Sequence, residues 1–310
     1  MFPAGELPGT AREFEWRKTM DDAHIKSLAT PSHGPVERRQ FLFMSSCAVG
    51  YAAAAGPVNA QAISTSAEGL TAGEVKVASL GVDIPAYRAH PAQGGPFPTV
   101  IVVQEIFGVH EHIKDVVRRF AKAGYYAIAP ELYARQGDAS KFDDIAKLQA
   151  ELVSKVPDAQ VASDIDNAIG FAKASGKADT AKLAIVGFCW GGRQVWLNTI
   201  RNPAFKAGAA WYGPLKGEPN DLRPKTVLDV IKDSKVPVIG LYGGADAGIP
   251  MDQIEAAKAA LKAANSPSEI NVYPDTPHGF NADYRPSYRK AAAEDAMAKT
   301  LAWFRKHGAG

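Results

Sequence analysis

The feature that most constrains this 310-residue chain is a cysteine flanked by glycines, in the sequence VGFCWGG over residues 186–192. Residues 183–186 are all apolar, and a helix-compatible segment, 193–200, follows the motif. The pattern therefore predicts a buried strand that turns sharply into a helix, with glycines that allow close packing around the turn. At the tip, Cys189 would stand at a helix N-terminus, where unpaired amides and the helix dipole favour a thiolate. We interpret the motif as a nucleophile elbow that carries cysteine.

The cysteine content supports this interpretation. The chain has two cysteines, Cys47 and Cys189, and the first falls in a segment that we expect to be removed. Cys189 would then be the only thiol of the mature protein, with no intrachain disulfide partner and no set of thiol ligands around it. A lone cysteine is commonly a small buried hydrophobe. The glycines on both sides favour a nucleophile instead.

Residues 1–62 have the pattern of an export signal. Arg38 and Arg39 form a twin-arginine pair, an apolar and alanine-rich stretch follows over 41–55, and a small-x-small pattern ends at Ala62. The apolar stretch is shorter than the roughly 20 residues that a membrane span needs. We expect a twin-arginine translocation (Tat) signal that is cleaved after Ala62, with no stable membrane insertion.

The expected cut leaves residues 63–310, a length that suits one α/β domain. Translation could begin at Met1 or at Met20, and both starts keep the arginine pair. Because the predicted leader has a twin-arginine signal, the expected partner of the precursor is the Tat machinery, which carries folded proteins. We expect the mature protein to be periplasmic or secreted.

Charge and composition exclude several other partners. The formal net charge is only +2, and no run of lysine or arginine stands out, so we expect no nucleic-acid partner. Among the histidines of the mature chain, the best pair for a metal ion is His110 and His112. Their i, i+2 spacing is poor for a helical metal site. We expect no metal ion and no cofactor.

Apolar runs alternate with amphipathic stretches after Ala62, which predicts a mostly parallel sheet with helices on both faces. The first two strands could pair as a hairpin across Gly81, which would give the sheet an antiparallel start. The predicted strands are 74–79, 84–89, 99–104, 126–129, 183–186, 207–212, 238–242 and 269–273, and the predicted helices are 112–123, 160–174, 251–264 and 286–307. In such sheets ligands bind beyond the carboxyl ends of the strands, where the motifs of this chain fall.

An acid and a histidine follow the elbow in chain order. Asp246 ends the sequence GGAD after the strand 238–242, and His278 follows the strand 269–273. A thiol nucleophile needs a base, and the base needs an orienting carboxylate. The order nucleophile, acid, histidine is that of α/β-hydrolases. Asp275 competes with Asp246 for the orienting role, but it lies on the histidine's own loop, and we favour Asp246.

A fourth candidate, Glu105, comes directly after the strand 99–104. A glutamate at the end of an apolar strand is costly unless it is paired or functional, although it could also be a helix cap. The loop after this strand supplies one oxyanion amide in α/β-hydrolases, beside the amide that follows the nucleophile. We therefore expect the backbone N–H groups of Ile106 and Trp190 to form the oxyanion hole.

With these motifs in place, the chain resembles the dienelactone hydrolase family, the carboxymethylenebutenolidases of the α/β-hydrolase superfamily. The resemblance rests on five segments in the family's order: QEIFG (104–108), ELYARQ (131–136), GFCWGG (187–192), YGGAD (242–246) and HGF (278–280). It implies an α/β-hydrolase fold, with Cys189 as nucleophile, His278 as base and Asp246 as its orienting acid. It also implies that Glu105 pairs with the resting thiol and helps to deprotonate it when substrate arrives.

The residues expected to bind substrate depart from the family's pattern. Family members hold the dienelactone carboxylate with an arginine and a tyrosine after the second motif, whereas residues 137–156 contain lysines but neither of these. Where the family has an arginine four residues after the histidine, this chain has Ala282, with an arginine three residues later. The candidate substrate contacts are Tyr133, Arg135, Trp211 and Arg285. Trp190, Trp211 and Tyr212 suit a pocket and a core equally well.

The sequence thus predicts a carboxylic ester hydrolase that acts on lactones or activated, enol-type esters through a thioester acyl-enzyme. An enol is a good leaving group for a thiolate because it departs without strong protonation. Two alternatives stay open. One is a hydrolase of other thioesters or aryl esters, and the other is a thiol sensor or binding protein on the same scaffold.

Overall fold

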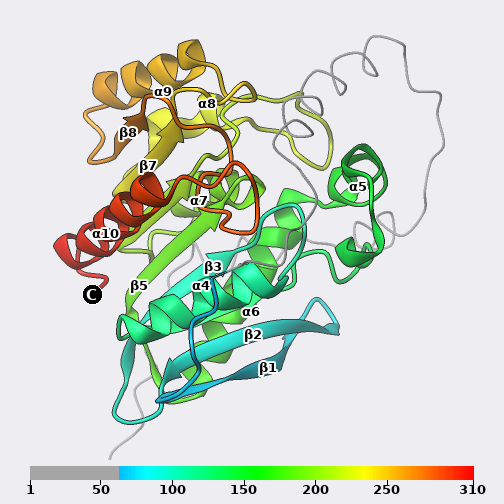
Figure 1. The fold of residues 1–310 in the computed structure, drawn as a ribbon, viewed down its shortest axis with the longest axis vertical. Coiled ribbons are helices and arrows are strands. Elements are labelled where there is room, and N and C mark those ends of the chain that lie inside the picture. The colour runs from blue at the N-terminus through cyan, green and yellow to red at the C-terminus, as the bar shows by residue number, and fades with distance from the viewer. Residues whose placement is uncertain (1–62) are drawn as a thin grey trace, which may run out of the picture. The chain divides into compact units, whose positions relative to one another are not determined.

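The computed structural model describes residues 63–310, so the twin-arginine segment and the rest of the predicted leader lie outside the described residues (Figure 1). The described chain contains an eight-stranded sheet in the order β1-β2-β4-β3-β5-β6-β7-β8. From β4 to β8 every neighbouring pair is parallel, whereas β2 is antiparallel to both of its neighbours. The strands are β1 (Leu70–Ser79), β2 (Val82–Pro91), β3 (Phe97–Val103), β4 (Tyr126–Pro130), β5 (Ala178–Phe188), β6 (Ala207–Trp211), β7 (Val238–Gly243) and β8 (Glu269–Tyr273). This architecture confirms the predicted α/β-hydrolase class.

The central strands form where the sequence is continuously apolar. Every residue of β4, β6 and β7 is buried, as expected for parallel strands with helices on both faces. The predicted hairpin at the start of the sheet is confirmed, because β1 and β2 pair along their whole length. Leu80 and Gly81 connect them with φ of 48° and 79°, and two consecutive residues with positive φ are the signature of a tight hairpin turn.

Helices cover both faces of the central strands (Figure 1). On one face the ring of Phe120 in α4 stacks on that of Phe304 in α10, with centroids 6.2 Å apart. On the other, Arg201 of α7 forms an ion pair with Asp166 of α6, with an N–O distance of 2.8 Å. The helices are α4 (Glu111–Lys122), α5 (Ile145–Glu151), α6 (Asp158–Ala174), α7 (Trp190–Arg201), α8 (Val227–Val230), α9 (Met251–Ala263) and α10 (Lys290–Lys306).

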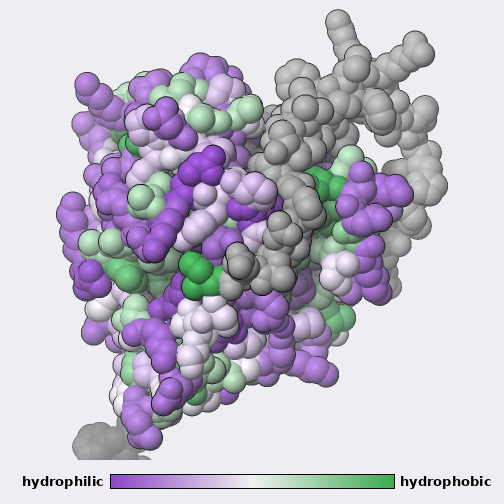
Figure 2. All heavy atoms as spheres, in the orientation of Figure 1, coloured by the Kyte–Doolittle hydropathy of each residue, from purple (hydrophilic) through white to green (hydrophobic). Residues whose placement is uncertain are grey.

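The first described residues lie against α4. The Arg118 side chain donates a hydrogen bond from Nε to the backbone oxygen of Thr65, at 2.9 Å, and the Thr65 amide donates to Asp115. None of the helices in the described part of the chain is long and apolar enough to cross a membrane. Hydrophilic residues make up most of the described surface in Figure 2, and the apolar spots among them are small. Scattered apolar residues of this kind are normal on a globular protein.

Candidate active site

The strand–turn–helix geometry predicted for the cysteine motif is confirmed. β5 ends at Phe188, α7 begins at Trp190, and Cys189 stands between them with φ of 54° and ψ of −119°. Positive φ is rare in residues other than glycine, and such strain is found at functional sites. Two backbone hydrogen bonds fix the turn, because the Cys189 amide donates to the Trp211 oxygen at 3.0 Å and the Gly192 amide donates to the Cys189 oxygen at 2.9 Å.

The glycines of the motif are required by close backbone approaches. A Cβ atom on Gly187 would lie 2.2 Å from the backbone oxygen of Gly191. A Cβ atom on Gly191 would lie 2.4 Å from the oxygen of Gln104, and one on Gly192 would lie 2.5 Å from the oxygen of Trp211. All three distances are shorter than a side chain can tolerate, so only glycine allows the start of α7 to pack against the ends of β3 and β6.

The predicted base and acid meet at the same end of the sheet. His278 donates a hydrogen bond from Nδ1 to Oδ2 of Asp246 at 2.6 Å, and both side chains are buried. The imidazole also makes a side-chain hydrogen bond with Cys189. Oδ1 of Asp246 accepts from the Gly248 amide at 2.8 Å, which fixes the carboxylate. Asp275, the competing acid, is exposed. Cys189, His278 and Asp246 thus lie in the spatial order that the predicted triad requires.

The electrostatics favour a protonated imidazole at His278. Burial disfavours a charged imidazole, but the negative charge of Cys189 and the hydrogen bond to Asp246 outweigh it. Together they raise the pKa of His278 to about 10. Such a histidine can hold a proton near neutral pH and can deliver that proton to a leaving group.

The expected oxyanion amides lie on segments that touch each other. Trp190 is the first residue of α7, so its N–H group has no acceptor within the helix. Ile106 follows β3 on the next segment of the chain. The backbone at the end of β3 packs directly against Gly191, since a Cβ atom on Gly191 would lie 2.4 Å from the oxygen of Gln104. The close contact between these segments would hold the two N–H groups on one side of Cys189.

A second pair of sequence motifs interlocks beside this loop. Oε2 of the half-buried Glu131 accepts a hydrogen bond from the Val109 amide at 2.7 Å, and Oε1 of Gln104 accepts from the Leu132 amide at 3.1 Å. Gly108 has φ of 73°, and a Cβ atom there would lie 2.8 Å from Oε2 of Glu131. The segments 104–108 and 131–136 are therefore one structural unit, which sets the path of the loop that carries Ile106.

Glu105 lies in a buried cluster that sequence reasoning did not predict. The Tyr284 hydroxyl donates a hydrogen bond to Oε2 of Glu105 at 2.8 Å, and Nε2 of His110 lies 3.6 Å from the same oxygen. Burial alone would raise the pKa of this carboxyl, but His110 and the positive charge of Arg285 outweigh burial and hold the pKa well below its usual range. The guanidinium of Arg285 lies over the Phe107 ring, 4.2 Å from its centroid.

Tyr133 and an unpredicted arginine lie near the predicted nucleophile. The Tyr133 ring meets that of Trp190 edge-on, with centroids 5.1 Å apart. Burial raises the pKa of Tyr133 well above its usual value, the charge of Cys189 raises it further, and Arg223 opposes the rise, so both groups lie near this hydroxyl. Arg223 comes from the segment between β6 and α8, and its Nη2 donates to the Ser154 oxygen at 3.2 Å. No motif in the sequence marked it.

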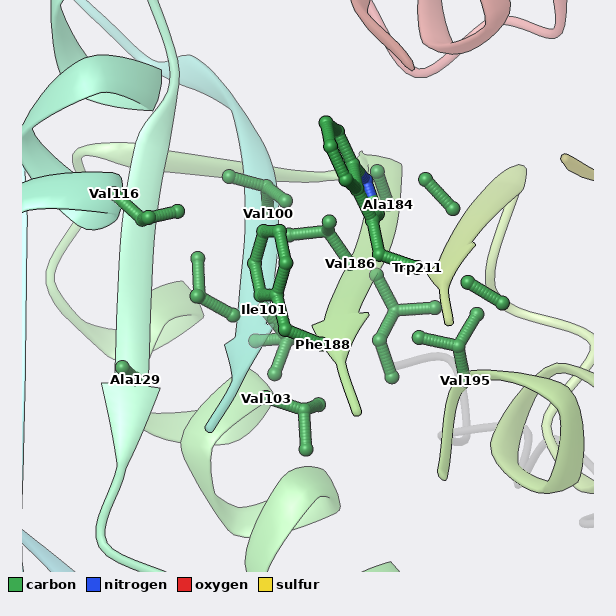
Figure 3. Packing of buried hydrophobic residues seen from close by; sticks show 14 of the residues in the cluster. Val100, Ile101, Val103, Val116, Ala129, Ala184, Val186, Phe188, Val195 and Trp211 are labelled. Atoms are coloured by element: carbon green, nitrogen blue, oxygen red, sulfur yellow. The ribbon is translucent and has the colours of Figure 1, made fainter. Parts of the chain in front are cut away.

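Two of the expected substrate contacts, Arg135 and Trp211, make ion-pair and core contacts in the structure. Arg135 donates from Nη1 to Oδ2 of Asp164 at 2.8 Å, so its charge ties the second motif to α6. Trp211 is fully buried, and its ring packs against Phe188 and Phe280 with centroids 5.3 and 5.6 Å away. Figure 3 shows it among the core side chains. The spacing of a motif does not reveal on which side of a strand end a side chain lies.

Comparisons with known proteins point to one family. The model of the Dienelactone hydrolase family matches residues 84–308. A "Putative carboxymethylenebutenolidase" of Methylorubrum extorquens is 56% identical over 291 residues, which cover 94% of this chain and 99% of the relative. A protein of the same description from Escherichia coli K12 is 50% identical over 260 residues, 84% of this chain and 96% of that protein. The crystal structure of a "Putative Dienelactone Hydrolase" from Klebsiella pneumoniae, 53% identical, superposes with a TM-score of 0.75 and covers 76% of this chain and 99% of that one.

Proposed function

Because the chain belongs to the dienelactone hydrolase family, we propose that it hydrolyses lactones or enol-type esters through a thioester on Cys189. One observation carries the proposal: the His278 imidazole is hydrogen-bonded to Cys189 on one side and to Asp246 on the other. A buried thiol on a strained elbow, next to an oriented base, has the chemistry of a nucleophile.

In the first half-reaction, the Cys189 thiolate attacks the carbonyl carbon, and the carbonyl oxygen becomes an oxyanion held by the Ile106 and Trp190 amides. Removal of one such amide costs about 3 kcal/mol of transition-state stabilisation in related sites. The bond to the ring oxygen then breaks, the enolate leaves and takes up a proton from His278, and the acyl group stays on sulfur. In the second, water attacks the thioester, His278 takes its proton, and the carbon–sulfur bond breaks to release the acid.

The arginines of the site support a substrate with a carboxylate. The lysines of the segment 137–156 are exposed. In contrast, the positive charge of Arg223 acts on Tyr133, and that of Arg285 acts on Glu105. Arginine can bind a carboxylate through two parallel hydrogen bonds, which lysine cannot do. We assign the carboxylate-binding role of the family to these two arginines.

The proposal is tested by trapping the acyl-enzyme. The mature protein is mixed with cis- or trans-dienelactone, quenched in acid during turnover, and digested for peptide mass spectrometry. The expected result is an acyl adduct on the peptide that contains Cys189, absent from Cys189→Ala. Turnover without any adduct in either isomer would contradict a thioester intermediate. Reversible oxidation of Cys189 without turnover of any ester would favour the thiol-sensor alternative.

We also propose that a Tat signal exports the protein, on the basis of the sequence of residues 1–62. Expression of the full chain in a Tat-competent bacterium is expected to yield a shorter periplasmic form that begins at Ile63, as read by N-terminal sequencing. The double variant Arg38→Lys/Arg39→Lys should retain the full-length chain in the cytoplasm. Arg12→Lys/Arg17→Lys changes two other leader arginines and serves as the control. Equal export of both double variants would rule out the twin-arginine route.

A further inference from the structure

The carboxylate of Glu105 is held by two groups on one oxygen. Tyr284 donates its hydroxyl to Oε2 at 2.8 Å, and Nε2 of His110 lies 3.6 Å from that atom. The Glu105 side chain is 4% exposed, whereas that of His110 is 26% exposed. A buried carboxylate keeps its charge only if donors or positive charges compensate for lost hydration. Tyr284 and His110 supply that compensation at Oε2.

Tyr284 is itself held in place from several sides. Its ring lies 5.1 Å from the ring of His110 and 5.2 Å from that of His112, between centroids. Nδ1 of His112 lies 3.2 Å from Oδ1 of Asp283, the residue before Tyr284, and Asp283 also pairs with Arg119 of α4. The contacts through His112 and Asp283 do not involve Glu105, so they position the tyrosine hydroxyl independently of it, as a preorganised donor must be.

This cluster adjoins the nucleophile. Burial, followed by the charges of Glu105 and Cys189, raises the pKa of Tyr212, so both groups lie near the same hydroxyl. The displacement of Glu105 would thus change the charge beside the reacting sulfur. The titratable and charged groups that act on Glu105 from the packed segments are His110, His112, Tyr284, Arg285 and Tyr212.

We infer that Tyr284 and His110 form a clamp that fixes the Glu105 carboxylate as an anion beside the nucleophile, and that Tyr284 is a positioning residue of the reaction. The inference rests on the proposed function, because the position of Glu105 matters for turnover only if Cys189 is the nucleophile. Tyr284 acts through Glu105 and makes no contact with the reacting atoms in this scheme.

A double-mutant cycle separates this role from a structural one. Tyr284→Phe removes the donor, so Glu105 should become easier to protonate, and the acid limb of the kcat/KM profile should move up by about one pH unit. In a Glu105→Gln background the same substitution should leave the profile unchanged, because nothing remains to be held. Equal shifts in both backgrounds, or no shift in either, would overturn the clamp.

An infrared readout makes the test independent of turnover. The carbonyl stretch of a protonated, buried carboxyl is followed as the pH is lowered. Tyr284→Phe is expected to show this band at a pH at least one unit higher than the wild type, and the double variant with Glu105→Gln should lack it. If the wild type turned over no lactone, the proposed function would fail, but the infrared comparison would still decide whether the clamp exists.

Two further variants complete the design. Tyr242→Phe removes a hydroxyl that accepts a hydrogen bond from Trp196 at 3.1 Å, equally buried but outside the cluster, and its pH profile should match that of the wild type. If Tyr284→Phe does not fold, as judged by circular dichroism, His110→Gln replaces it in the same cycle. A shift for His110→Gln that persists in the Glu105→Gln background would contradict the clamp.

Discussion

Replacement of Cys189 by alanine is expected to lower kcat for lactone hydrolysis by about 10⁴-fold or more, because removal of a nucleophile costs this much or more in related hydrolases. Cys189→Ser should be similarly impaired, since a hydroxyl gives up its proton far less readily than a thiol and the site is arranged for a thiolate. The native backbone already has positive φ at this position, so neither substitution adds backbone strain. Steady-state kinetics on both dienelactone isomers check the prediction.

The same variants should change the titration of His278. The negative charge of Cys189 is the largest of the causes that raise its pKa to about 10. Without that charge, less opposes the effect of burial, which disfavours the charged imidazole. The pKa of His278 should therefore fall. Nuclear magnetic resonance of labelled histidine measures this directly. Retained lactone hydrolysis in Cys189→Ala, or an unchanged His278 pKa, would contradict the proposed thiolate–imidazolium pair.

Gly191→Ala is expected to disrupt the structure as well as the activity. The new Cβ atom would lie 2.4 Å from the backbone oxygen of Gln104 and 2.5 Å from that of Val103. Backbone atoms cannot rotate out of the way as a side chain can, so α7 or the loop after β3 must move. We expect the free energy of unfolding to fall by about 3 kcal/mol or more. The displaced loop would carry Ile106 with it, so kcat should fall too.

Gly170→Ala in α6 is the matched control for this substitution. A Cβ atom there meets nothing within 4 Å and the backbone is helical, so alanine should stabilise the helix by up to about 1 kcal/mol. Urea denaturation of both variants measures the difference. Gly191→Ala with the stability of the wild type would mean that the elbow is far more tolerant than its contacts indicate.

Most of the fold could be predicted from the sequence because the signals for strands and turns are local. Continuous apolar runs marked the buried parallel strands, and the glycines at the elbow marked a turn that only they allow. The bounds of the helices were predicted less accurately. The helix predicted from residue 286 begins at Lys290, because residues 281–289 fold back and place Tyr284 against Glu105. The short helix α5 was missed, although Asp144 caps it by accepting a hydrogen bond from the Lys147 amide.

The remaining site residues depend on contacts between distant segments. Tyr284 and Glu105 are 179 positions apart in the chain, and no spacing rule relates them. Arg223 lies in a segment without motif, and only the fold brings its charge near Tyr133. Conversely, Arg135 lies in a motif segment and Trp211 at the end of a predicted strand, yet the first makes an ion pair and the second packs in the core. A motif places the backbone of a site better than it places individual side chains.

The positive φ at position 189 belongs to the architecture rather than to the residue. β5, α7 and the hydrogen bond from the Cys189 amide to Trp211 impose the same backbone on any residue placed there. A sulfur or an oxygen nucleophile would therefore stand at nearly the same point in space, and an exchange would alter the range of leaving groups without altering the scaffold. The backbone of the elbow thus accepts either nucleophile, and the evolution of new ester chemistry on this fold can begin with the exchange of sulfur for oxygen at this one position.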